Sequence, residues 1–352
     1  MKIIIAGCGK VGYALAEQLN EEGHELTIID INEEKGRLVG NVLDVMCIQG
    51  NATSYRVQEE AGVKEADLLI AVTNKDEVNL LCCLIARKAG HCQTIARVRD
   101  PGYYAEIGFI KEELGLSLAI NPELAAAREI ARLLRFPSAI KIEPFAKGRI
   151  ELLKFQIPQG SILDRMKVMA VVSRLKSNVL ICAVERGSEV VIPDGNFVML
   201  GGDKISFIAP HADSAEFFHK AGIENNTVNT AMFVGGGRLT VYLAKALAGA
   251  KIKMKIIERD EERCRLLSEL LPEAMIIHGD GSDQQLLLEE GIRQTEAFAS
   301  LTGFDEENIM LSLYAASQSK AKLITKVNKI AFENVINSLN LGSVIYPKML
   351  TA

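Results

Sequence analysis

The feature that most constrains the fold is the opening stretch, MKIIIAGCGKVG. Lys2 to Ala6 is a short apolar run rich in β-branched isoleucine, which predicts a buried strand. Gly7, Gly9 and Gly12 follow as G-x-G-x-x-G and open a helical pattern. In such a unit the first glycine permits a tight turn, the second lets a pyrophosphate approach the backbone, and the third lets the helix pack on the strand. The stretch therefore predicts a dinucleotide-binding Rossmann unit.

An acidic residue about 20 positions after such a loop strengthens this interpretation. The next predicted strand, Leu26 to Ile29, ends in Asp30. A carboxylate at this point binds a ribose 2′-hydroxyl and repels a 2′-phosphate, which favours NAD(H) or an adenosine nucleotide over NADP(H). The N-terminus of the helix offers free N–H groups to the pyrophosphate. The ligand is therefore expected to contact Gly7, Cys8, Gly9, Lys10, Val11, Gly12 and Asp30.

Alternation of strands and helices continues along the first third of the chain. Further strands are predicted at 45–48, 67–72, 94–98 and 118–120, and helices at 33–39, 55–61, 77–89, 103–114 and 123–134. This alternation predicts an α/β fold with a doubly wound parallel sheet, in which ligands bind beyond the carboxyl ends of the strands. The candidates at those ends are Asn51, Ala52, Thr73, Asn74 and Arg97. Arg97 is a candidate phosphate partner, and the alternative is a structural ion pair with a nearby acid.

The pattern changes after Phe136. Short strands are predicted at 140–142, 152–157, 179–184, 190–192 and 204–208, and a final helix at 214–221. Turn signals such as Pro193-Asp194-Gly195 separate them. This segment predicts a small α+β domain without a glycine loop.

The first pattern then returns. Gly235 lies 228 residues after Gly7, and Glu258 lies 228 residues after Asp30. This register is typical of an internal repeat and predicts a second doubly wound parallel sheet, with the small α+β domain between the two Rossmann domains. The candidate ligand residues of the repeat are Gly235, Gly236, Gly237, Arg238, Leu239, Glu258, Asp280 and Thr302.

The second loop carries Thr240 where the first has its third glycine, and Lys326 falls opposite Arg97. A side chain at the packing position and a lysine that cannot clamp a phosphate bidentately predict a weaker or different second site.

The predicted domains are 1–135, 136–224 and 228–352. Pro347 matches Pro122, which opens a helix in the first copy, yet the sequence stops at Ala352. We therefore expect a truncated chain that lacks a second small domain.

Composition excludes several classes of protein. The net charge is −5 and no basic stripe stands out, so a nucleic-acid partner is not expected. The sequence has no apolar run of about 18 residues and no signal peptide. The seven cysteines form no C-x-x-C pair, which indicates reduced core residues in a cytosolic protein. No metal site is predicted.

The chain resembles the regulatory subunits of Trk-type bacterial potassium uptake systems, part of the wider RCK (regulator of K⁺ conductance) family. The residues that carry the resemblance are Gly7–Gly12, Asp30, Gly50–Thr53, Thr73–Asn79 and Ala96–Pro101. The resemblance implies binding of NAD(H), with ATP or ADP as a further ligand, and assembly as a homodimer or homotetramer. It also implies a cytoplasmic protein, peripheral at the inner face of the cell membrane, that gates a potassium transporter subunit and is not an enzyme.

Two alternatives stay open. One is an NAD-dependent oxidoreductase whose substrate groups come from another chain, and the other is a ligand-free tandem of Rossmann domains. A dehydrogenase needs a proton donor or acceptor beside the nicotinamide. The sequence shows no His–Asp or Tyr–Lys constellation outside the nucleotide loops, so no catalytic residue is predicted.

Overall fold

A computed structural model provides the coordinates of the chain. It describes residues 1–136, 138–145, 149–187, 189–223, 228–328, 336, 339, 341–347 and 349. The helix expected after Pro347 falls largely on residues 348 and 350–352, which lie outside the described residues.

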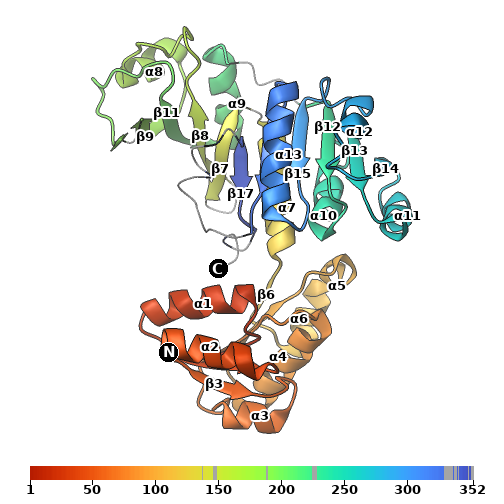
Figure 1. Cartoon of the computed structure of the whole chain (residues 1–352). Coiled ribbons are helices and arrows are strands. Elements are labelled where there is room, and N and C mark those ends of the chain that lie inside the picture. The colour runs from red at the N-terminus through yellow and green to blue at the C-terminus, as the bar shows by residue number, and fades with distance from the viewer. Residues whose placement is uncertain are drawn as a thin grey trace. The chain divides into compact units, whose positions relative to one another are not determined.

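The first sheet has six parallel strands in the order β3-β2-β1-β4-β5-β6 (Figure 1). Its elements are β1 (Lys2–Ala6), α1 (Lys10–Glu21), β2 (Glu25–Asp30), α2 (Glu33–Leu43), β3 (Met46–Gln49), α3 (Tyr55–Glu60), β4 (Leu68–Ala71), α4 (Asp76–Gly90), β5 (Gln93–Arg97), α5 (Pro101–Ala105), α6 (Ile107–Leu114) and β6 (Leu118–Ile120). The order reverses between β1 and β4, where a doubly wound sheet opens its ligand crevice.

Both faces of this sheet are covered, because alternate residues of β1 enter two different cores. Ile3 and Ile5 pack with Ala16 of α1 and Val39 of α2. Ile4 packs on the opposite face in a core that includes residues of α4. The near-continuous apolar strands of the sequence follow from burial on both faces.

One helix is divided where the sequence predicted a single one over 103–114. The chain forms α5 and α6 instead, and Glu106 between them leaves the α-helical region with φ −97° and ψ 12°. Asp100 caps α5 by accepting from the backbone N–H of Gly102 at 2.8 Å. The cap and Pro101 start the helix earlier than the apolar periodicity indicated.

The small sheet is antiparallel, in the order β10-β9-β11-β8-β7. It follows α7 (Pro122–Arg135) and comprises β7 (Ala139–Phe145), β8 (Ile150–Gln156), α8 (Val168–Leu175), β9 (Leu180–Arg186), β10 (Glu189–Val191), β11 (Lys204–Pro210) and α9 (His211–Lys220). Fully buried Phe155, Phe207, Phe217 and Phe218 meet edge-on or tilted in its core. Helix α8 was missed by the sequence analysis, since its apolar run is only two turns long.

The third sheet repeats the first, as predicted: six parallel strands in the order β14-β13-β12-β15-β16-β17. Its elements are β12 (Thr230–Val234), α10 (Arg238–Leu247), β13 (Lys253–Glu258), α11 (Glu261–Leu270), β14 (Met275–His278), α12 (Gln284–Glu289), β15 (Ala297–Ser300), α13 (Asp305–Gln318), β16 (Lys322–Lys326) and β17 (Ser343–Ile345). The predicted fold class, two doubly wound sheets separated by a small α+β domain, is confirmed.

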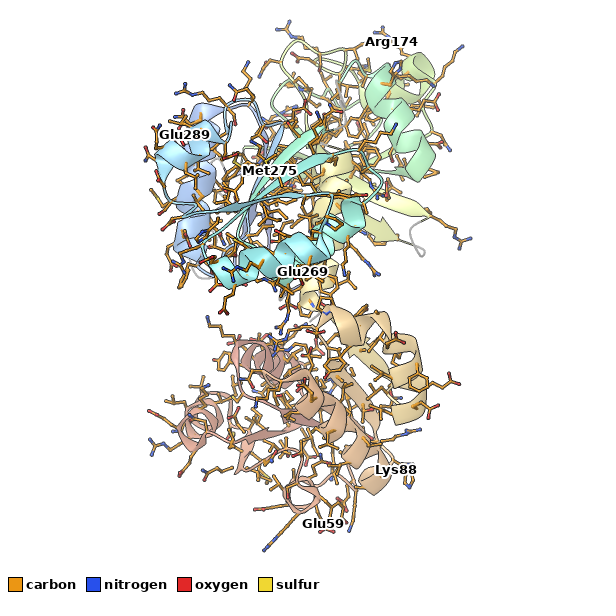
Figure 2. The ribbon with its side chains drawn as sticks, turned by 90° about the vertical axis from the view of Figure 1, so that its right-hand side faces the viewer. Glu59, Lys88, Arg174, Glu269, Met275 and Glu289 are labelled. Carbon is orange, nitrogen blue, oxygen red and sulfur yellow. The ribbon has the colours of Figure 1, made fainter. Side chains whose placement is uncertain are left out.

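The chain divides into two compact units, Met1–Ala125 with Pro347–Ala352, and Ala126–Tyr346. Most of α7 therefore groups with the second unit, whereas the sequence analysis ended the first domain at residue 135. The three predicted domain limits stay a proposal. Charged side chains such as Glu59, Lys88 and Glu269 lie on the exposed faces of helices (Figure 2). Within the described part of the chain, no helix is long and apolar enough to cross a membrane.

Candidate functional site

The glycine loop of the first sheet forms a cradle at the end of β1. Gly7 has φ +104°, a conformation that side chains disfavour, and its N–H donates to the Ile29 carbonyl at 2.8 Å. A Cβ at Gly12 would lie 1.9 Å from the Gly7 carbonyl oxygen. A Cβ at Gly9 would meet no protein atom within 4 Å. Two glycines therefore shape the loop, and Gly9 leaves open space in front of the N-terminus of α1.

Asp30 fixes this loop from the end of β2. Its Oδ2 accepts from the backbone N–H of Cys8 at 2.5 Å, and its Oδ1 accepts from the N–H of Asn32 at 2.8 Å. Each carboxylate oxygen can accept a second hydrogen bond, so the group can still receive a ribose hydroxyl. The role predicted for Asp30 is compatible with this geometry, and the contact with Cys8 was not foreseen.

The remaining loop residues contribute their backbone more than their side chains. Lys10 is exposed, and Val11 is half-buried in the first turn of α1. Cys8 is 6% exposed, and burial together with Asp30 raises the pKa of its thiol to about 11. The thiol is therefore protonated at neutral pH and packs in the core with Ile3 and Ile5.

The turn after β3 is held by its own side chains. Asn51 Oδ1 accepts from the backbone N–H of Thr53 at 3.0 Å and from the Thr53 hydroxyl at 2.8 Å. Ala52 is buried in the core, so only its backbone could touch a ligand.

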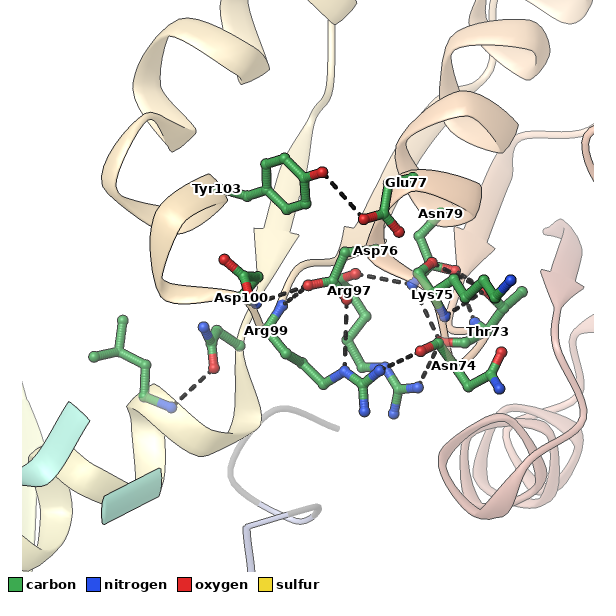
Figure 3. A network of polar contacts seen from close by, with 12 residues as sticks. Thr73, Asn74, Lys75, Asp76, Glu77, Asn79, Arg97, Arg99, Asp100 and Tyr103 are labelled. Atoms are coloured by element: carbon green, nitrogen blue, oxygen red, sulfur yellow. Dashed lines mark hydrogen bonds and ion pairs between the residues drawn. The ribbon is translucent and has the colours of Figure 1, made fainter. Parts of the chain in front are cut away.

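The side chains of Asn79 and Arg97 hold the turn after β4 (Figure 3). Buried Asn79 accepts from the N–H of Thr73 at 2.8 Å and from its hydroxyl at 2.6 Å, and donates to the Arg97 carbonyl at 2.9 Å. The Arg97 guanidinium donates to the Thr73 carbonyl at 2.6 Å. This bond brings the ends of β4 and β5 together and holds a cation at the crevice edge.

Arg99 adds a second cation that the candidate set did not include. Its Nη2 donates to the Asn74 carbonyl at 2.5 Å, and its Nε lies 3.5 Å from a carboxylate oxygen of buried Asp76 (Figure 3). Asp76 also accepts from the N–H groups of Arg99 and Asp100, each at 2.7 Å. The pair of arginines at alternate positions was the signal that could have identified it.

The second sheet has a measurable cavity of about 280 Å³ at the same place. It is lined by Val234, Gly235, Gly236, Gly237, Ile257, Glu258, Arg259, Gly279, Asp280, Gly281, Leu301, Thr302, Gly303, Phe304, Glu307 and Lys326. Six of the eight predicted residues are among them. The other two lie in the first turn of α10, where Arg238 is exposed and Leu239 is buried in the core.

The second loop is built like the first. Gly235 has φ +101°, and a Cβ at Gly237 would meet no protein atom within 4 Å. Glu258 accepts from the N–H of Gly236 at 2.7 Å and from the N–H of Asp260 at 2.9 Å. The longer glutamate thus makes both contacts that Asp30 makes. The Arg263 guanidinium, which sequence reasoning missed, donates to the Gly236 carbonyl at 2.7 Å.

The strand ends on the other side also correspond. Asn308 accepts from the Thr302 N–H at 2.9 Å and donates to the Lys326 carbonyl at 3.0 Å. Lys326 Nζ donates to the Thr302 carbonyl at 2.8 Å, as Arg97 does to Thr73. Hydrogen bonds from the N–H and hydroxyl of Ser282 lower the pKa of Asp280.

Thr240 is buried between the helix and the glycine loop. Its side chain is fully buried, and its hydroxyl donates to the Gly235 carbonyl at 2.5 Å. Thr240 occupies the position of Gly12 in the first copy. There the helix approaches the loop without a side chain, and here a side-chain hydrogen bond joins the helix to the loop. The structural reason given for a weaker second site is therefore incomplete.

Both sites carry the kinds of group that bind an adenine dinucleotide. Each has open space before a helix N-terminus, a carboxylate at the end of the second strand and a cation at the fifth. Bound there, NAD(H) would rest its pyrophosphate on the glycine loop and its adenosine ribose on Asp30 or Glu258. Among the described residues, no group of three His, Cys, Asp or Glu side chains is placed to hold a metal ion.

Comparison with known proteins agrees with the repeat. The family model of the TrkA-N domain matches residues 3–122 and again 231–347, and that of the TrkA-C domain matches 152–222. The chain is 34% identical to the Trk system potassium uptake protein TrkA homolog of Archaeoglobus fulgidus, over 100% of this chain and 79% of the relative. It is 32% identical to the TrkA protein of Haemophilus influenzae, over 100% of this chain and 77% of that relative.

Solved structures show the same fold. The GsuK channel superposes with a TM-score of 0.75 at 18% identity, over 99% of this chain and 61% of the channel chain. The GsuK channel bound to NAD gives a TM-score of 0.72 at 18% identity, with the same coverage. This chain therefore spans less than two thirds of those channel chains. The two TrkA-N matches, the TrkA-C match between them and the full-length similarity to curated relatives show that the chain belongs to the TrkA family of Trk system potassium uptake proteins.

Proposed function

We propose that the protein is a regulatory subunit that binds NAD(H), and also ATP or ADP, and gates potassium entry through a membrane transporter subunit. The observation that supports this most is the duplicated crevice, in which an acidic side chain holds the glycine loop in both copies. A ligand changes such a protein by binding one conformation better than another. Both crevices are therefore sensor sites.

The proposed setting follows from the relatives. The curated relatives carry the name Trk system potassium uptake protein, and a fold neighbour is a channel bound to NAD. We infer a cytoplasmic protein, peripheral at the inner face of the membrane through its partner, which assembles as a homodimer or homotetramer. Light scattering of the purified chain measures the oligomer, and co-purification with a Trk-type membrane subunit tests the partner.

Direct binding tests the nucleotide assignment. Calorimetry with NADH should detect binding to two crevices of unequal affinity, the second weaker because Lys326 replaces Arg97. Gly9→Val should remove one site and Gly237→Val the other, because each added side chain enters ligand space and meets no protein atom within 4 Å at its Cβ. Two equal NADH sites would contradict the inequality, and no effect of either valine would remove the glycine loops from the site.

The competing function is an NAD-dependent oxidoreductase with substrate groups from another chain. We propose that the protein does not turn over NADH. Incubation with NADH and candidate substrates, followed by the loss of nicotinamide absorbance, separates the two. Sustained oxidation that Gly9→Val abolishes would favour the oxidoreductase.

A further inference from the structure

The two crevices differ at the ends of their fourth and fifth strands. The first crevice places three cationic residues there, Lys75, Arg97 and Arg99. Arg97 and Arg99 donate to the Thr73 and Asn74 carbonyls, so both guanidinium groups stay at this edge. Arg99 is also paired with buried Asp76 at 3.5 Å, so this half of the first crevice is an edge of mixed charge without an aromatic ring from the matched position.

The second crevice has a different character at the matched positions. Phe304 stands where the first copy has Lys75, and Asn328 where it has Arg99. Phe304 is 61% exposed and lines the cavity. Glu307, opposite Val78 in the repeat, lines the same cavity and accepts from the Thr302 hydroxyl at 2.9 Å. This half therefore presents an aromatic ring and a carboxylate.

The topology decides which part of a dinucleotide meets these groups. A dinucleotide lies across the point where the strand order reverses, here between β12 and β15. Glu258, at the end of β13, takes the adenosine ribose in that arrangement. The nicotinamide half then extends to the ends of β15 and β16, beside Phe304 and Glu307.

We propose that Glu307 and Phe304 make the second crevice selective for NAD⁺ over NADH. The two ligands differ at the nicotinamide ring, which carries a positive charge in NAD⁺ and none in NADH. A carboxylate attracts that charge, and the face of an aromatic ring stabilises it further. Lys326 also lines this cavity, where its Nζ donates to the Thr302 carbonyl at 2.8 Å, and Arg97 supplies a cation at the matched position of the first crevice. This inference rests on the proposed binding of NAD(H), and assigns the preference for NAD⁺ to the second crevice.

The test uses the whole chain with the first crevice blocked by Gly9→Val. Calorimetric titration of this variant with NAD⁺ and with NADH should give about 10-fold tighter binding of NAD⁺, the order expected from one partly exposed ion pair and one cation–π contact. Glu307→Gln should then weaken NAD⁺ about 3-fold and leave NADH unchanged. Glutamine can still accept the Thr302 hydroxyl, so the turn is kept.

The matched control is Glu306→Gln, which removes an exposed carboxylate from the same helical turn but outside the cavity. It should change neither affinity. Equal affinities for NAD⁺ and NADH, or equal effects of Glu307→Gln on both ligands, would overturn the selectivity while leaving the nucleotide site in place. Two further results together would refute the second nucleotide site, and the selectivity with it. Neither ligand would bind the Gly9→Val chain, and the single variant Gly237→Val would bind both ligands with the same heat as wild type.

Discussion

At the scale of single residues, Asp30 and Glu258 each combine two tasks. Each carboxylate accepts a backbone N–H from its glycine loop and another from the residue two positions ahead. The loop is thus held in shape before a ligand arrives. Preorganisation of this kind lowers the entropy that binding must overcome.

Removing Asp30 should impair binding in two ways, by loosening the glycine loop and by removing the proposed acceptor for the ribose hydroxyl. Asp30→Ala should weaken NADH by about 1–3 kcal/mol, since loop N–H and ribose hydroxyl groups lose their acceptor. Calorimetry measures this, and Glu34→Ala is the control because it removes an exposed carboxylate from the first turn of α2. An Asp30→Ala protein with unchanged NADH affinity would remove this residue from the site.

Gly12 should be required for stability rather than for contact with the ligand. An alanine Cβ there would lie 1.9 Å from the Gly7 carbonyl oxygen, so Gly12→Ala should destabilise the protein by about 1–3 kcal/mol. Gly108 in α6 has no protein atom within 4 Å of its Cβ position, and Gly108→Ala should stabilise by about 0.4–1 kcal/mol. Urea unfolding compares the two variants, and equal midpoints would contradict the packing role.

The turn at Gly7 and the place of Asp30 beside the glycine loop could be predicted, because a glycine spacing and an acidic strand end are local patterns. The Arg99 bond to the Asn74 carbonyl was not, since it depends on how two strand ends meet. Thr240 is a second example. The repeat register showed that threonine replaces the third glycine, but the hydrogen bond of Thr240 to the Gly235 carbonyl depends on backbone positions that the register does not specify.

At the scale of elements, the repeat predicted the strand order of the third sheet from the first. Alternating strands and helices leave few topologies once crossovers are right-handed. Boundaries were less predictable, as the division between α5 and α6 and the missed α8 show. Both depend on local backbone conformation rather than on hydrophobic periodicity.

Strand β16 links two parts of the second unit. Its last residue, Lys326, lines the crevice, and its first, Lys322, donates through Nζ to the Ala139 carbonyl of β7. Ser343 of β17 donates to the neighbouring Ile140 carbonyl at 2.8 Å. The small sheet is therefore hydrogen-bonded to the sheet that carries the second crevice.

This contact predicts a pH dependence of stability. Burial lowers the pKa of Lys322 from its usual 10.5 to about 8. Between those values the unfolded chain binds more protons at this group than the folded chain, so its contribution to stability rises with pH from about 8 to 10.5. Urea unfolding of wild type and Lys322→Met should be measured at pH 7.5 and at pH 10. The free energy of unfolding of wild type, relative to that of the variant, should be higher at pH 10. A constant difference between the two proteins would contradict the lowered pKa.

At the scale of the whole molecule, the chain combines two crevices, which we propose to bind nucleotides, with a small domain that follows the first of them. Allosteric control requires each ligand to favour one state of the assembly, and couplings of about 1–3 kcal/mol are typical. The sequence predicted this organisation through its repeat and its family resemblance. The sequence did not reveal the contrast between the crevices, because only the structure shows that Phe304 and Glu307 line the same cavity.

The central claim is that nucleotides in these crevices gate potassium entry. The most direct test is potassium flux through a reconstituted Trk-type membrane subunit with the purified chain bound. NADH and ATP should change the flux, and the chain carrying both Gly9→Val and Gly237→Val should bind the membrane subunit but lose the response to nucleotides. Flux that ignores both nucleotides while wild-type chain is bound, or a response that survives both substitutions, would contradict the account.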